Sequence, residues 1–201
     1  MSYVTIHMDN LLHSLKRWIH ENRHAIDTIS VRSGGWEHWL NSQFAYWLGA
    51  GFNAPGLDVQ SEVESINTLN GAVSIFENFR ERADLVFNGL TGSVQGEPPV
   101  IVVETKCQTP KRKRAAFLSD LRRDRVKLEG INAELRMMNS GRVYGLSLGI
   151  CFGGMPTVPG YTQEHITNNI ALQWQVVDPC PDPDHDEEWD SDDDPDPWSE
   201  N

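Results

Sequence analysis

Residues 100–106 read VIVVETK, a run of four β-branched apolar residues that ends abruptly in an acid, a threonine and a lysine. Such a run predicts a buried, central β-strand. Glu104 and Lys106 are two residues apart, so in a strand both project from the face that also carries Val102. Isolated charges are costly to bury, so we expect these two to be paired, bound to a metal or placed at a functional edge.

Asp84 has the same character, because it lies within the strand-like run 82–87, RADLVF. Carboxylates from two neighbouring strands can hold one or two Mg²⁺ ions, which keep waters that phosphate oxygens can replace. A lysine beside them can orient or deprotonate an attacking water, or stabilise charge that develops on a phosphate. Asp84, Glu104 and Lys106 are therefore candidate catalytic residues. The structural alternative is an edge salt bridge from Glu104 to Lys106 or Arg82.

Hydrophobic periodicity around this centre predicts the element order α, α, β, β, β, α, β, β. The expected helices are 10–26, 36–48 and 111–138, and the expected strands are 59–66, 82–87, 100–106, 142–151 and 172–177. The Asn70-Gly71 pair favours a hairpin turn after the first strand. This order predicts an α/β fold with a mixed central sheet flanked by helices.

The length of 201 residues fits one domain with appendages. No run of about 18 apolar residues occurs, so the sequence predicts no membrane span. Three cysteines, Cys107, Cys151 and Cys180, form no CxxC pair, which favours a reducing environment. We therefore expect an intracellular, cytoplasmic protein. A nuclear location stays open, because residues 111–114 (KRKR) also fit a nuclear localisation run.

Charge is distributed unevenly along the chain. Of its 29 acidic residues, 12 lie in 178–201, which holds no Lys or Arg, so the other 177 residues carry 17 charges of each sign. Residues 106–127 hold nine basic residues against two acids, and this excess attracts anions. The candidate nucleic-acid contacts in this segment are Lys111, Arg112, Lys113 and Arg114, for which a solvated helix face is the alternative.

Asp84, 19 intervening residues and then Glu104-Thr105-Lys106 resemble the D…ExK signature of the PD-(D/E)xK nuclease superfamily, with Ala83 in place of the signature's proline. The element order from Trp36 to Cys151 resembles that family's restriction-endonuclease-like α-β-β-β-α-β core. The resemblance implies a nuclease that hydrolyses phosphodiester bonds in DNA or RNA with Mg²⁺ or Mn²⁺, bound by Asp84 and Glu104.

Two further residues gain roles from the same resemblance. Glu37, on the helix before the first strand, stands where many members carry another metal-site acid. Gln108 extends the motif to ExKxQ and is expected to contact nucleic acid. The chain then divides into an N-terminal helical extension (1–32), a nuclease-like domain (33–178) and an acidic tail (179–201), which is expected to be disordered.

Several alternatives stay open. The chain could be a catalytically inactive member of the same fold that works as a binding or regulatory module. Residues 20–24 read HENRH and fit the HExxH pattern of zinc peptidases, with His20 and His24 as ligands and Glu21 as base. Specificity could come from a homodimer or from a partner protein bound through the acidic tail. We also hypothesise that this tail folds over the basic helix and restrains activity.

Overall fold

The computed structural model describes residues 4–31, 36–51, 56–68, 71–90, 98–108, 113–140, 142–152 and 157–178. The acidic tail (179–201) and the predicted contacts Lys111 and Arg112 lie outside the described residues. No helix within the described ranges is long and apolar enough to cross a membrane.

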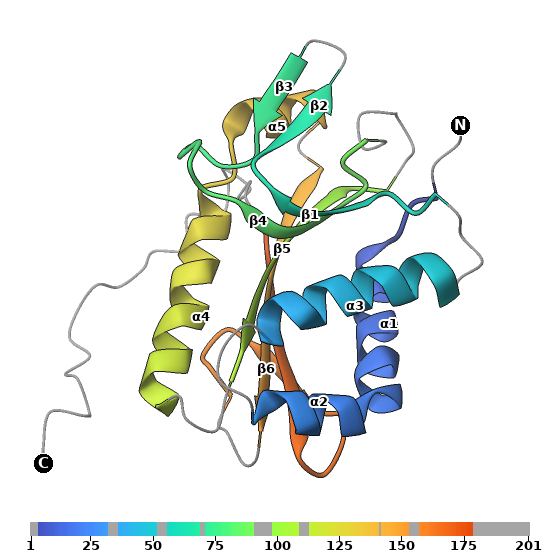
Figure 1. Ribbon diagram of the computed structural model, residues 1–201. Helices are drawn as coiled ribbons and strands as arrows, with labels where there is room; N and C mark the ends of the chain where they lie inside the picture. Colours follow the sequence, from blue (N-terminus) through green and yellow to red (C-terminus); the bar gives the residue numbers. More distant parts are fainter. Residues whose placement is uncertain are drawn as a thin grey trace, which may run out of the picture.

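Helices cover both faces of a central sheet in the described part of the chain (Figure 1). The helices are α1 (Met8–Glu21), α2 (Arg23–Ser30), α3 (Trp36–Gly51), α4 (Arg114–Glu129) and α5 (Ala133–Met138). The strands are β1 (Val59–Val63), β2 (Ser65–Thr68), β3 (Gly71–Ser74), β4 (Ala83–Phe87), β5 (Val100–Cys107), β6 (Val143–Phe152), β7 (Thr162–His165) and β8 (Ile170–Val177).

The described strands form a six-stranded sheet of order β1-β4-β5-β6-β8-β7 and a separate two-stranded sheet, β2-β3. Strands β5 and β6 are parallel, whereas the other neighbours in the large sheet are antiparallel. The predicted α/β class with a mixed central sheet is therefore confirmed. As expected from its apolar run, β5 lies inside the sheet, between β4 and β6.

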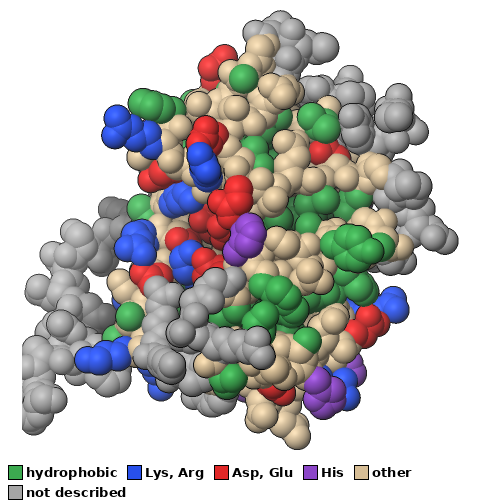
Figure 2. All heavy atoms as spheres, viewed as in Figure 1, with side chains coloured by type: hydrophobic (Ala, Val, Ile, Leu, Met, Phe, Trp, Pro, Cys, Tyr) green, Lys and Arg blue, Asp and Glu red, His purple; other side chains and the backbone are tan. Residues whose placement is uncertain are grey.

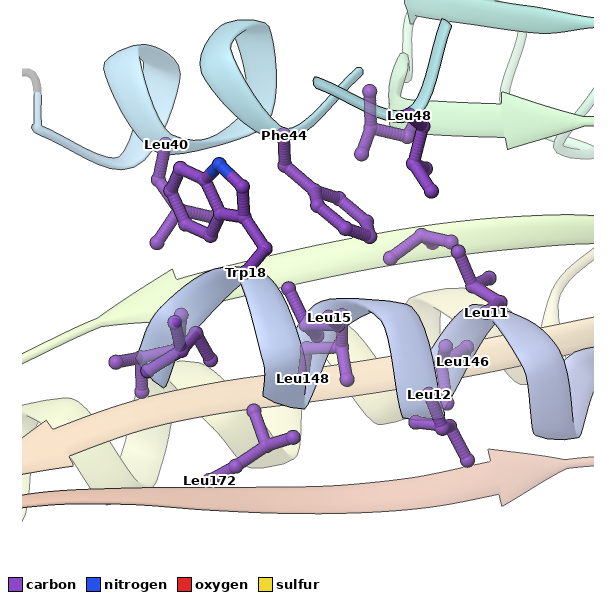
Figure 3. Packing of buried hydrophobic residues seen from close by; sticks show 14 of the residues in the cluster. Leu11, Leu12, Leu15, Trp18, Leu40, Phe44, Leu48, Leu146, Leu148 and Leu172 are labelled. Atoms are coloured by element: carbon purple, nitrogen blue, oxygen red, sulfur yellow. The ribbon is translucent and has the colours of Figure 1, made fainter. Parts of the chain in front are cut away.

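The first face of the sheet packs against α1 and α3. Figure 3 shows Trp18 and other apolar side chains of α1 lying between Leu40 and Phe44 of α3 and Leu148 of β6. Ile101 of β5 belongs to the same cluster. The predicted N-terminal extension (1–32) thus shares its core with the rest of the protein.

The opposite face packs against α4, which comes unusually close to β6. A Cβ atom added to Gly145 would lie 2.9 Å from Cβ of Leu128, and one added to Gly149 would lie 3.1 Å from Leu121. Between these glycines, Ser147 is also small and fully buried. Because side chains alternate along a strand, these three residues lie on the same face of β6 and form a strip without bulky side chains, against which α4 packs.

Three predicted elements are interrupted in the structure. The helix expected at 10–26 breaks at Asn22, whose side chain donates to the carbonyl of Trp18 and ends α1. The helix expected at 111–138 ends at Glu129, because Gly130 forms its C-cap and Asn132 then caps the start of α5 by accepting from the Glu134 N–H. Local capping by backbone and side-chain groups therefore ends these helices where the hydrophobic periodicity continues.

The strand expected at 59–66 is also divided, because β1 and β2 belong to different sheets. Glu62 adopts a left-handed backbone conformation with φ of 54°. This turns the chain, so that Val59 packs with the first face whereas Val63 packs with the second. The predicted hairpin follows as β2-β3, which begins its second strand at Gly71, while Asn70 lies outside the described residues.

Candidate active site

The charged side chains meet where β4 and β5 part. The Cα pairing of these strands ends at Leu85 and Val103. Beyond that pair, the Thr105 N–H donates to Oδ2 of Asp84 at 2.7 Å, and the Cys107 N–H donates to Oε2 of Glu37 at 3.2 Å. Carboxylates thus replace a strand partner for β5, which fixes both acids beside the charged end of that strand.

Six charged residues of the described chain gather here, and we call them the charged cluster: Glu37 from α3, Asp84 from β4, Glu104 and Lys106 from β5, and Asp124 and Lys127 from α4. Figure 2 shows acidic and basic side chains interleaved on this side of the molecule, between α4 and α3 as they are placed in Figure 1.

Glu104 is almost fully enclosed, with 2% of its surface exposed. Its Oε1 accepts a hydrogen bond of 2.7 Å from Nζ of Lys127. Burial and, less strongly, the neighbouring charge of Asp84 together raise the pKa of Glu104 to about 8, against the opposing effect of Lys127. Burial also raises the pKa of Asp84, although the Thr105 N–H favours its ionised form. The ammonium of Lys127 therefore does not compensate the cost of burying the negative charges of Asp84 and Glu104.

Lys106 lies between two acids on different helices. Its Nζ donates to Oε1 of Glu37 at 2.9 Å and lies 3.3 Å from Oδ2 of Asp124. Burial alone would lower the pKa of Lys106, but the charges of Glu37 and Asp124 outweigh it and hold the pKa above its ordinary value. The Lys106 side chain is consequently a fixed, protonated ammonium at neutral pH.

Asp124 was not predicted as a site residue. It is 5% exposed, and its Oδ2 makes no hydrogen bond with good geometry despite the nearby ammonium of Lys106. Burial raises the pKa of Asp124 to about 6 against the opposing effect of Lys106. A signal was available in the sequence, because Asp124 falls within the apolar stripe of its helix, three residues after Leu121 and four before Leu128.

The cluster fits a divalent cation through two of its acids. With all groups ionised, it holds four carboxylates against two ammonium groups. Asp84 and Glu104 supply oxygen ligands, and Mg²⁺ commonly takes one or two carboxylates while keeping waters. The described residues contain no group of three or more His, Cys, Asp or Glu that could hold a metal. Glu37 in particular uses both oxygens on Lys106 and Cys107 rather than joining the other two acids.

Of the predicted nucleic-acid contacts, the structure describes Gln108, Lys113 and Arg114, and none of these three is bonded to the charged cluster. Lys113 and Arg114 are exposed at the start of α4. Gln108 is half-buried, and its Oε1 accepts a hydrogen bond of 2.9 Å from the Phe152 N–H, so it ties the end of β5 to β6.

The HExxH pattern does not form one continuous helix. His20 lies in the last turn of α1, and His24 lies in α2 beyond the break at Asn22. Neither histidine belongs to a group of metal-binding side chains in the described part of the chain. The geometry thus gives the zinc-peptidase interpretation no support.

Comparisons with protein families, with curated proteins and with solved structures found no match to this chain.

Proposed function

We propose that this protein is a divalent-metal-dependent nuclease with a restriction-endonuclease-like core. The order α3-β1-β4-β5-α4-β6 supports this arrangement, with the first three strands antiparallel and β6 parallel to β5. One observation carries the function: Asp84 and Glu104 lie in one cluster with the ammonium of Lys106, where the Thr105 N–H holds Asp84 at 2.7 Å and Glu37 holds Lys106 at 2.9 Å. Catalysis of phosphodiester hydrolysis needs oxygen ligands for a metal and a positive group near the phosphate.

Asp84 and Glu104 would hold the metal, and Mg²⁺ or Mn²⁺ bound there would supply Lewis-acid polarisation of the phosphate. The Lys106 ammonium donates hydrogen bonds, so it positions the attacking water through its oxygen and stabilises negative charge on the phosphate. Because Glu37 and Asp124 raise its pKa in the metal-free protein, we assign Lys106 to positioning and charge stabilisation rather than to the role of base.

Glu37 and Asp124 are positioning residues in this proposal. They approach Lys106 from two different helices, α3 and α4, at 2.9 and 3.3 Å. A lysine side chain has many rotamers, and ordering it costs free energy at the moment of reaction. Two fixed carboxylates remove that cost in advance, because they hold the ammonium in one place before substrate arrives.

Cleavage of nucleic acid by the purified full-length chain tests the proposal. Single- and double-stranded DNA and RNA would each be incubated with Mg²⁺, Mn²⁺ or EDTA, beside a Lys106→Ala variant. Lys16→Ala is the matched control, because Lys16 also pairs with a glutamate, Glu164, at 2.6 Å but on another part of the surface. We expect metal-dependent cleavage that is lost in Lys106→Ala and kept in Lys16→Ala.

Absence of cleavage with every metal and substrate would refute the nuclease proposal and favour an inactive binding or regulatory module. The Lys127–Glu104 contact favours this second candidate, because it satisfies one site oxygen without a metal. That candidate predicts nucleic-acid binding that is unchanged by EDTA.

A further inference from the structure

Lys127 is held at three points inside the charged cluster. Its Nζ donates to Oε1 of Glu104 at 2.7 Å and to the carbonyl oxygen of Arg82 at 2.5 Å, and it lies 4.8 Å from the ring centroid of Phe76. The side chain is 19% exposed. None of these contacts was predicted from the sequence, where Lys127 is one of nine basic residues in the segment 106–127.

The position of this ammonium competes with that of a metal. A cation at the Asp84–Glu104 pair would need the oxygens of Glu104, and Lys127 already occupies Oε1. An ammonium and a divalent cation repel each other strongly at contact distance in a partly buried site. A metal at this carboxylate therefore has to overcome the repulsion from the Lys127 ammonium or displace it.

Lys127 can leave Glu104 for solvent. The Arg82 carbonyl and the face of Phe76 hold its ammonium less strongly than a carboxylate does, because neither carries a net charge. Because Lys127 is partly exposed, its ammonium can turn towards water without breaking the packing of α4, which rests on Phe117, Leu121 and Leu128.

We propose that Lys127 is an internal counter-ion, which occupies the cation position at Glu104 in the metal-free protein and is displaced from that carboxylate by an incoming divalent metal. The inference rests on the proposed function, because it takes Asp84 and Glu104 as the metal ligands. It deepens that function by adding a form of regulation. In the metal-free protein Lys127 holds the Glu104 side chain in place, and a metal must compete with Lys127 to bind Glu104.

Chemical labelling of lysines in the unmodified protein tests the displacement directly. An amine-acylating reagent would be applied in EDTA and then with Mn²⁺ or Mg²⁺ alone, and each lysine would be followed by mass spectrometry. In EDTA we expect slow labelling of Lys127 and fast labelling of exposed Lys113. Metal should accelerate labelling of Lys127 several-fold and leave Lys113 unchanged. Calorimetrically detected metal binding with no change at Lys127 would overturn the proposal and leave the nuclease proposal standing.

Metal affinity gives a second, independent measurement. Calorimetric titration with Mn²⁺ should show binding at least about tenfold tighter in Lys127→Met than in the unmodified protein, because the competing charge is gone. Lys16→Met removes the same charge from a Lys–Glu pair outside the site and should leave the affinity unchanged. Equal or weaker binding in Lys127→Met would refute the counter-ion role. Failure of any variant, and of the unmodified protein, to bind metal would refute this inference together with the proposed metal site.

Discussion

Replacement of Glu104 by glutamine separates a metal site from an ordinary structural salt bridge. Glutamine keeps the shape and leaves an oxygen that can accept from Lys127, but it removes the charge. If the Glu104–Lys127 contact exists to stabilise the fold, Glu104→Gln should weaken the protein at every pH. If the carboxylate is held there for a metal, the same change should strengthen the metal-free protein.

The size of the effect follows from the pKa of Glu104, which burial and Asp84 raise from 4.5 to about 8. Between these values the unfolded chain has lost the proton while the folded protein keeps it. Stability of the unmodified protein therefore falls as pH rises through this window, and it levels off above about pH 8. Each pKa unit corresponds to about 1.4 kcal/mol, so a rise from 4.5 to about 8 means that the ionised carboxylate costs on the order of 5 kcal/mol at alkaline pH.

Urea unfolding in EDTA between about pH 5 and pH 9 measures this directly. Glu104→Gln should match the unmodified protein near pH 5 and exceed it by about 2 kcal/mol or more above pH 8. Added Mg²⁺ should stabilise the unmodified protein and not the variant. Glu164→Gln, which alters the more exposed Lys16–Glu164 pair, should show no such gain. A Glu104→Gln protein that is less stable throughout this range would contradict our reasoning.

Two further changes test the parts that support the site. Gly145→Ala should destabilise the protein by about 1 to 3 kcal/mol, because its new Cβ would lie 2.9 Å from Leu128 and push α4 off β6. Gly49→Ala, which meets nothing within 4 Å in α3, should be neutral or slightly stabilising in the same urea unfolding assay, and equal losses would contradict the close-packing argument. Asp124→Asn should lower kcat for cleavage about tenfold to a hundredfold with a smaller change in KM, because Lys106 loses one of its two carboxylates. Partial recovery in Asp124→Glu would support a positioning role, and an unchanged kcat would count against it.

The positions of the central strands in the sequence could be predicted from local runs of apolar residues. The segments 82–87, 100–106 and 142–151 appear as β4, β5 and β6 with ends shifted by no more than one residue. The hydrophobic pattern gave wrong element boundaries where a single residue changes the path of the backbone. Gly130 ends a helix that periodicity would have continued, and the left-handed conformation of Glu62 reverses the faces within β1 shortly before that strand ends at Val63.

The sequence by itself determined which acids and bases would share a face of β5, because strand geometry places every second residue on the same side. Only the tertiary structure decided their partners. Lys106 meets Glu37 across 69 positions of the chain, and Glu104 meets Lys127 across 23, rather than the neighbours that spacing suggested. These pairs exist because β4 and β5 part beyond the Leu85–Val103 pair, on the side of Asp84 and Glu104, and because glycines in β6 let α4 pack close to the sheet with its charged side chains. Such contacts depend on distances between elements, which no local periodicity encodes.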